Sequence, residues 1–170
     1  GAASAIGGED ATAPSFVGIG LGQVALGDDK GYAKIDNAGS VDLTASAYAE
    51  SGSLGGGSNN AVAAAGFLAG VAQVAWGSTE AAASLTNVAT ADATAPASIV
   101  GAAKATAVAD NEATAVAGYG IGLGQLAFAD AKADATVDNN GVISFTAAAD
   151  ATAEEDDAHA YSGFLVGGLQ

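Results

Sequence analysis

The chain has 170 residues; half are apolar, mostly alanine, and 25 are glycine. Four lysines and no arginine stand against 19 aspartates and glutamates, and this net charge of −15 argues against recognition of nucleic acid or anionic membrane surfaces. The absence of cysteine excludes a disulfide scaffold and thiolate metal sites.

Residues 1–9 form a short lead. Its first five residues, Gly-Ala-Ala-Ser-Ala, are compatible with the start of a mature secreted protein, so we expect an extracellular or cell-surface location. The longest apolar run in the chain, Ala61–Trp76, contains Gly66, Gly70 and Gln73 and is short for a membrane helix. We therefore expect no membrane insertion.

The segment after the lead recurs without a gap. Each copy reaches a glutamine thirteen residues after its first residue, and a glycine lies three residues before that glutamine. Successive glutamines are 50, 52 and 45 residues apart, a period typical of stacked or radially repeated architectures. The copies are Asp10–Gly27, Asn60–Gly77, Glu112–Ala129 and Asp157–Gln170; the glutamines are Gln23, Gln73, Gln125 and Gln170, and the glycines are Gly20, Gly70, Gly122 and Gly167.

Side-chain alternation indicates that this segment is a strand. Val17, Phe67, Tyr119 and Phe164 lie six residues before each glutamine and share its face if the chain is extended. A helix would scatter the glycines of the opposite face around its circumference and be weakened by each one. The large residues that we expect in the core are Phe67, Tyr119, Phe164, Trp76, Phe128 and Phe145.

A polar turn follows the first strand of each copy, and a second strand follows the turn. The turns are residues 28–30, 78–80 and 130–132, and small or aliphatic residues resume after them. Fourteen residues past each glutamine comes an asparagine: Asn37, Asn87 and Asn139.

A third alternating strand follows each asparagine. We align Val41–Ala47 with Ala91–Ala97 and with Ile143–Ala149, which places Thr44, Thr94 and Thr146 at one position of the opposite face. Pro96 weakens the prediction for the middle copy because proline lacks the backbone N–H. We interpret Glu50–Asn59, Ile99–Asn111 and Thr152–Asp156 as the variable bridges to the next copy.

These features predict an all-β chain with a stacked repeat architecture, either a large-rung β-solenoid or an amyloid-like stack. It would hold three rungs of about fifty residues, at 10–59, 60–111 and 112–156, and a partial fourth at 157–170. A propeller needs at least about four units to close. Stacking at about 4.8 Å per rung instead lets the glutamine and asparagine amides form hydrogen-bonded ladders.

The recurring Gln, Ala, Ile or Val, and Asn positions on strand–turn–strand units, in a glycine-rich chain without arginine, resemble the secreted functional amyloids of bacterial biofilms. These are the curli-type and Fap-type fibre subunits. The resemblance covers the pattern of recurring positions over most of the chain. It implies an extracellular fibre that scaffolds a matrix or attaches cells, without catalysis.

The acidic residues at the predicted turns offer two interpretations. Carboxylates can bind calcium, and the candidate ligands are Asp28, Asp29, Asp36, Asp138, Glu154 and Asp157, although no EF-hand loop is present. The simpler interpretation, which we favour, is a solvated anionic coat that keeps fibres apart. We expect no other cofactor and no catalytic residue, because His159 is the single histidine and stands at a position that threonine or valine occupies in the other copies.

The open ends of a stack expose unpaired backbone groups that can continue onto another copy. We therefore expect a non-enzymatic subunit of an extracellular filament that polymerises head to tail with itself and contacts cell-surface or matrix components. The alternative is a β-solenoid adhesin or ice-binding module built on threonine faces. The threonine positions are interrupted by Val62, His159 and Ala148, which makes this alternative weaker.

Overall fold

The structure is a computed structural model that describes residues 1–7, 10–52 and 59–169. Over these residues the chain forms strands and no helix. The strands in chain order are β1 (Ala2–Gly7), β2 (Ala11–Leu26), β3 (Lys30–Asn37), β4 (Ser40–Ser51), β5 (Asn60–Trp76), β6 (Glu80–Asn87), β7 (Ser98–Ala109), β8 (Glu112–Phe128), β9 (Lys132–Asn139), β10 (Val142–Ala153) and β11 (Ala158–Leu169).

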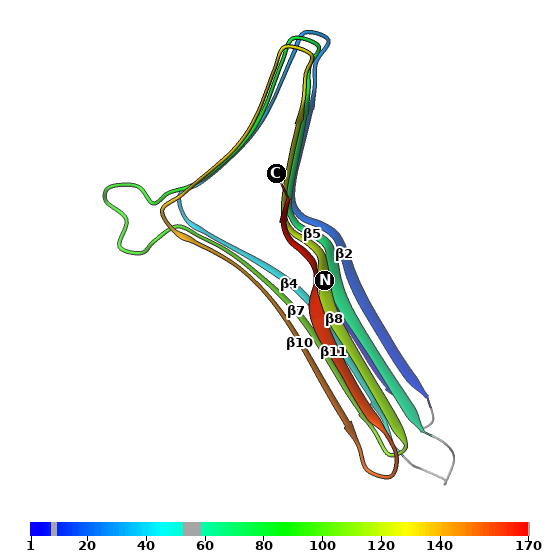
Figure 1. Ribbon diagram of the computed structural model, residues 1–170. Coiled ribbons are helices and arrows are strands. Elements are labelled where there is room, and N and C mark those ends of the chain that lie inside the picture. The colour runs from blue at the N-terminus through cyan, green and yellow to red at the C-terminus, as the bar shows by residue number, and fades with distance from the viewer. Residues whose placement is uncertain (8–9, 53–58, 170) are drawn as a thin grey trace.

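The strands form three parallel sheets. Sheet A has the order β1-β4-β7-β10, sheet B has β11-β8-β5-β2 and sheet C has β3-β6-β9. Every strand therefore pairs with the equivalent strand of the neighbouring repeat. Figure 1 shows the strands of one sheet side by side and the chain following a three-cornered path from sheet to sheet. The all-β chain with parallel sheets is compatible with a β-solenoid or a stacked β architecture.

We call the strands at one level of the three sheets a layer. Layer 1 is β2, β3 and β4; layer 2 is β5, β6 and β7; layer 3 is β8, β9 and β10. The lead supplies β1, which extends sheet A by one strand beyond layer 1. At the opposite end, β11 extends sheet B by one strand beyond layer 3.

The core divides among the three sheets. The first halves of the sheet B strands pack against sheet A through alanines such as Ala63 and Ala105, and their second halves pack against sheet C through alanines such as Ala75 and Ala83. Larger aliphatic side chains meet where the three sheets converge, around Val71, Leu85 and Ile99. Aromatic side chains, such as Phe67 and Tyr119, pack within the core between sheets B and A. Alanine lines most of the two regions where sheet B faces sheet A and sheet C, because these sheets lie too close together to leave volume for larger side chains.

The register of the first two strands of each layer places equivalent residues above one another. Gln23 pairs with Gln73 and Gln73 with Gln125, while Asn37 pairs with Asn87 and Asn87 with Asn139. The first strands end at Leu26, Trp76 and Phe128, as the sequence predicts.

The predicted alignment of the third strand in the middle copy is wrong. The chain between Asn87 and Ser98 runs outside the strands, and Ile99–Ala109, which we interpreted as a bridge, lies in β7. Val41 and Ile143 pair with Ile99, and Thr44 and Thr146 pair with Ala102 rather than with Thr94. The reason is packing: Ile99 is fully buried at the junction of the three sheets, a position that an alanine run cannot fill.

Candidate functional site

The three asparagines form a hydrogen-bonded column at the corner between sheets C and A. Asn37 Nδ2 donates to Asn87 Oδ1 at 2.7 Å, and Asn87 Nδ2 donates to Asn139 Oδ1 at 2.6 Å. The same amide groups bond the first strand residue of the next layer, at Ser98 O (2.9 Å) and Val142 O (3.1 Å). Asn37 and Asn87 thus each join two layers and two sheets at one point.

The glutamines form a second column between sheets B and C. Gln125 Nε2 donates to Gln73 Oε1 at 2.8 Å and to Thr136 O at 2.9 Å, while Gln73 Nε2 donates to Ser84 O at 2.8 Å. Gln23 lies in register, but its Oε1 is buried without a hydrogen-bond partner. Gln170 lies outside the described residues. The glutamine amides donate towards layer 1, whereas the asparagine amides donate towards layer 3.

Aromatic rings form a third column. The rings of Phe67 and Tyr119 stack at 4.9 Å, and those of Tyr119 and Phe164 stack at 5.0 Å, both nearly parallel. Phe145 of sheet A packs against Tyr119 at 5.5 Å. The Tyr119 hydroxyl is buried without a hydrogen-bond partner, and this burial raises the pKa of Tyr119 to about 12.

Four of the six predicted core aromatics face inwards, and two do not. Phe67 and Tyr119 are buried and Phe145 is half-buried, whereas Phe164 is 43% exposed because β11 is the last strand of sheet B. Trp76 and Phe128 are 55% and 45% exposed, so the core prediction is wrong for them. Each lies three residues after a glutamine. Because side chains alternate between the two faces of a strand, a residue an odd number of positions from the inward-facing glutamine lies on the opposite, outer face.

The glycines before the glutamines lie where the sheets approach closely. A Cβ on Gly20 would meet Leu43 Cδ1 at 2.6 Å, and one on Gly70 would meet Phe145 Cε1 at 2.4 Å. Gly122 is buried in β8, and Gly167 lies within β11. The glycine column makes room for the large residues of sheet A.

The candidate calcium ligands do not converge. The described residues contain no group of three or more acidic or histidine side chains that could hold a metal ion. Asp36 forms an ion pair with Lys34 at 2.9 Å, whose hydrogen bond lowers the pKa of Asp36. Thr86 separates Asp36 from Asp138 in the column, so these two carboxylates are not direct neighbours.

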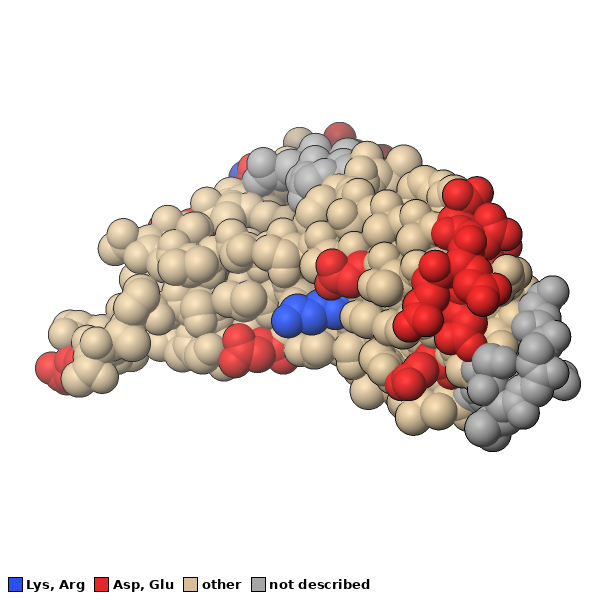
Figure 2. All heavy atoms as spheres, turned by 90° about the horizontal axis from the view of Figure 1, so that it is seen from below, with Lys and Arg blue, Asp and Glu red and all other residues tan. Residues whose placement is uncertain are grey.

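The remaining candidate ligands lie in turns between strands. Asp28 and Asp29 belong to the turn before β3, where Thr79 Oγ1 donates to the Asp29 carboxylate. Glu154 and Asp157 lie between β10 and β11. Figure 2 shows acidic side chains gathered at one end of the molecule. The acidic residues in or beside the turns from sheet A to sheet B are Asp10, Asp110, Glu112, Glu154, Glu155, Asp156 and Asp157.

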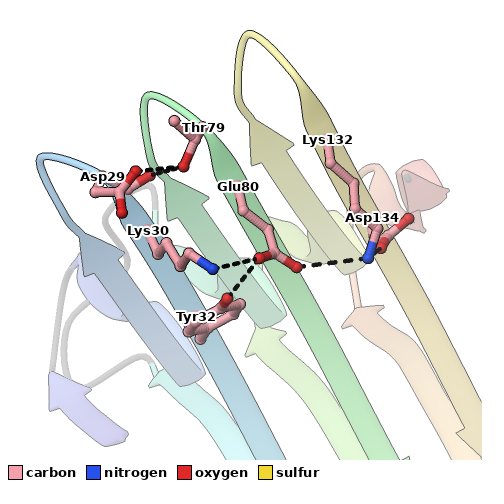
Figure 3. A network of polar contacts seen from close by, with 7 residues as sticks. All are labelled: Asp29, Lys30, Tyr32, Thr79, Glu80, Lys132 and Asp134. Atoms are coloured by element: carbon pink, nitrogen blue, oxygen red, sulfur yellow. Dashed lines mark hydrogen bonds and ion pairs between the residues drawn. The ribbon is translucent and has the colours of Figure 1, made fainter.

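Sequence reasoning missed a polar network on the outer face of sheet C (Figure 3). Glu80 accepts hydrogen bonds from Tyr32 Oη at 2.8 Å and Lys30 Nζ at 3.2 Å, and Lys132 Nζ lies 3.4 Å from its other oxygen. Lys132 also pairs with Asp134 at 2.9 Å. The Tyr32 and Lys30 hydrogen bonds lower the pKa of Glu80. The signal was available, since Lys30, Glu80 and Lys132 each follow a glutamine by seven residues.

The two ends of the molecule present open strand edges. One end exposes β1, β2 and β3, and the other exposes β10, β11 and β9. Because all pairings are parallel, both ends present strands that run in the same direction. The backbone groups on these edges are a template for further strands.

No protein-family model, curated protein or solved structure matches this chain. The described residues also contain no helix long and apolar enough to span a membrane.

Proposed function

We propose that this protein is a non-enzymatic structural subunit of an extracellular filament, which polymerises head to tail through its open strand edges. The observation that carries the proposal is the stagger of the two ends. Sheet A projects by β1 at the layer 1 end, and sheet B projects by β11 at the layer 3 end.

The two projections are complementary. If a second copy continues the stack, its β1 adds to β10 in sheet A, and its β2 adds to β11 in sheet B. One shared layer then contains β11 of the first copy and β1 of the second. In the shared layer, the described residues supply no sheet C strand between β9 and the next β3. In sheet A they supply only the half-length β1, which pairs with Ser46–Ser51 of β4 and not with Ser40–Ala45. Head-to-tail addition keeps every new pairing parallel, whereas head-to-head addition would require antiparallel pairing.

Backbone direction identifies residues that control the junction. Ala113 N of β8 donates to Asp157 O, so the backbone of Asp157 points towards β8. Backbone groups alternate in direction along a strand, so the N–H groups of Ala158 and Ala160 in β11 point away from β8, to the open edge. By the same alternation, Pro14 of β2 stands where an N–H would face the opposite open edge. Proline in an edge strand removes one donor and slows pairing with another chain.

We take the layers as three rungs of about fifty residues with a partial fourth, and the filament as a secreted fibre with a matrix or attachment role. The resemblance to curli-type and Fap-type subunits supports that role, and it rests on the pattern of recurring positions alone. Its partners would be further copies of itself and components of the cell surface or matrix.

The adhesin or ice-binding alternative has less support. A regular threonine surface needs threonine above threonine, but within the described residues no column holds threonine in more than two layers. The outer column of sheet B, for example, reads Thr12, Val62, Thr114 and His159.

Negative-stain microscopy and fibre diffraction of the purified protein test the filament. We expect unbranched filaments with a reflection near about 4.8 Å along the axis. Ala160→Pro should block growth, because it removes an edge N–H without breaking a bond inside the molecule, and Pro14→Ala should speed elongation. Particles that stay monomeric at all concentrations, or an Ala160→Pro variant that elongates normally, would contradict the proposal.

A further inference from the structure

Two clefts lie at the end of sheet B, and the single tryptophan of the chain lines both of them. Leu26, Trp76 and Phe128 form one exposed column on the outer face, and each is the last residue of its strand. The Phe128 ring packs against the Trp76 ring with 5.6 Å between the centroids. Leu26 carries no ring, so the column leaves the Trp76 ring accessible on the layer 1 side.

Each cleft combines apolar side chains with one carboxylate. The cleft between layers 1 and 2, of about 450 Å³, is lined by Leu26, Gly27, Asp28 and Trp76. The cleft between layers 2 and 3, of about 430 Å³, has a lining that includes Trp76, Phe128, Ser78 and Asp130. The larger groove at the bend of sheet B (Figure 1), of about 650 Å³, has no charged residue in its lining. The two clefts are therefore distinguished by a charge beside an aromatic ring.

The two carboxylates are not engaged within the described part of the molecule. Asp28 and Asp130 lie in the turns that follow the column, and both are exposed. Among the residues that the structure describes, neither carboxylate forms an ion pair or a hydrogen bond. Ser78 takes this position in layer 2, where its hydroxyl donates to the backbone carbonyl of Asp28. The chain thus presents two unpaired negative charges beside an exposed aromatic column.

An organic cation suits this combination better than a metal ion. Calcium takes six or more oxygen ligands, and the described residues bring together no group of three acidic or histidine side chains. A cation over an aromatic ring is attracted by the ring quadrupole, most strongly by that of tryptophan. Arginine fits both parts of each cleft, because its planar guanidinium stacks on aromatic rings and forms paired hydrogen bonds with a carboxylate.

The cation has to come from a partner. The chain has no arginine, and three of its four lysines, Lys30, Lys34 and Lys132, form ion pairs on the outer face of sheet C. The net charge of −15 attracts cationic partners and raises their rate of encounter. We propose that the two clefts bind arginine side chains of a partner protein, one guanidinium at Asp28 and one at Asp130, each against the aromatic column.

The spacing of the clefts defines the partner segment. Asp28 and Asp130 are two layers apart, which is about 10 Å at about 4.8 Å per strand. In an extended segment, alternate side chains point the same way about 6.6 Å apart, and long arginine side chains can cover the difference. An Arg-x-Arg segment that runs along the stack can therefore fill both clefts. This inference goes beyond the proposed filament, because the clefts exist on each subunit whether or not the subunits polymerise.

Trp76 reports on the clefts directly, because it is the only tryptophan. The probe is the peptide acetyl-Gly-Arg-Gly-Arg-Gly-amide, titrated into the Ala160→Pro variant so that assembly does not alter the emission. We expect a saturable change in Trp76 fluorescence. Asp28→Asn/Asp130→Asn keeps the side-chain shapes and removes both charges, so it should raise the Kd at least about tenfold. The same peptide with citrulline in place of arginine keeps the shape without the charge and should bind at least about tenfold more weakly.

Asp42→Asn/Asp150→Asn is the matched control. Both residues are exposed on strands of sheet A, so the change removes the same net charge away from the clefts. Because salt screens distant charges, this variant should keep the Kd within about twofold. Trp76→Leu tests the ring. Measured by the anisotropy of a fluorescein-labelled peptide, this change should raise the Kd at least about fivefold without altering the charge of the protein.

Three results would overturn the inference: a citrulline peptide that binds as tightly as the arginine peptide, an equal loss of affinity in the sheet A control, or a Trp76→Leu variant that binds normally. If the arginine peptide binds as expected but the wild-type protein forms no filaments, only the filament proposal fails. Filaments from a protein whose Trp76 fluorescence does not respond to the peptide would overturn only the arginine clefts.

Discussion

At the scale of single residues, the asparagine column places polar amides where backbone turns would otherwise lack partners. Asn87 is fully buried, and its side chain bonds one asparagine on each side and the Val142 carbonyl. A buried polar group is tolerated only when its hydrogen bonds are made, so the column is specific as well as cohesive.

Asn87→Ala should therefore lower the free energy of unfolding by about 2–3 kcal/mol, because it removes the three hydrogen bonds of a fully buried side chain. Urea unfolding of the Ala160→Pro variant, with and without the change, measures this effect free of assembly. Asn140→Ala, one residue beyond Asn139 and exposed, is the control and should cost little. Equal losses for both changes would mean that the column does not stabilise the fold.

Tyr119 shows the opposite case of a buried polar group without a partner. Gly101 leaves space beside it, since a Cβ on Gly101 would lie 2.7 Å from the Tyr119 hydroxyl. Tyr119→Phe keeps the stacked ring and removes the unpartnered hydroxyl, so it should stabilise the protein by about 1 kcal/mol at neutral pH.

The sign of the alkaline effect follows from the raised pKa of Tyr119. The folded state favours the neutral phenol. The pH-dependent stabilisation of the folded state by this group is therefore complete below the ordinary pKa of 10.0 and is lost as the pH rises through the folded-state pKa of about 12. Thermal unfolding between these pH values should show a steeper loss for the wild type than for Tyr119→Phe. Parallel curves would show that the hydroxyl is not desolvated.

At the scale of the strands, sheet C is held on its outer face by alternating charge rather than by amides. Lys30, Glu80 and Lys132 occupy one column of β3, β6 and β9, so each lysine borders the single carboxylate. Like charges stacked in register would repel, and this alternation avoids that repulsion.

Glu80→Gln should weaken the protein above pH 4.5 and make no difference in strong acid. The folded-state pKa of Glu80 lies below its ordinary value of 4.5, so the stabilisation is present above that value and disappears as the pH falls through the lower one. Unfolding midpoints of both proteins from pH 7 downwards should converge. Glu112→Gln, at the exposed start of β8, provides the comparison and should follow the wild type.

At the scale of the whole molecule, the net charge of −15 opposes the association of copies. Added NaCl should speed filament growth, because the Debye length falls from about 10 Å at 0.1 M to about 3 Å at 1 M. Light-scattering kinetics at matched ionic strength should be the same in NaCl and CaCl₂ if the acidic residues form a solvated coat. A faster rate in calcium alone would indicate bound calcium between copies.

Much of the stacked fold was predictable, because each prediction needed only counting and alternation. Equal spacing brought Gln73 opposite Gln125 and Asn87 opposite Asn139, and period-two alternation set Phe67 and Tyr119 on the inner face. The same alternation, applied to Trp76 and Phe128, would have assigned them to the outer face. Their size made them look like core residues, but size does not determine the direction of a side chain.

The amino-acid sequence by itself determined the period, the strand character, the equivalence of repeated positions and the excess of negative charge, because these are properties of local order and composition. Only the tertiary structure decided the course of the chain after Asn87, where residues 88–97 leave the stack and Ile99 reaches the three-sheet junction. Only the tertiary structure also showed the bend in sheet B and the stagger of the ends. These depend on contacts between residues distant in the chain, such as Ala2 with Ser46 and Val41 with Ile99, for which no local pattern provides a signal.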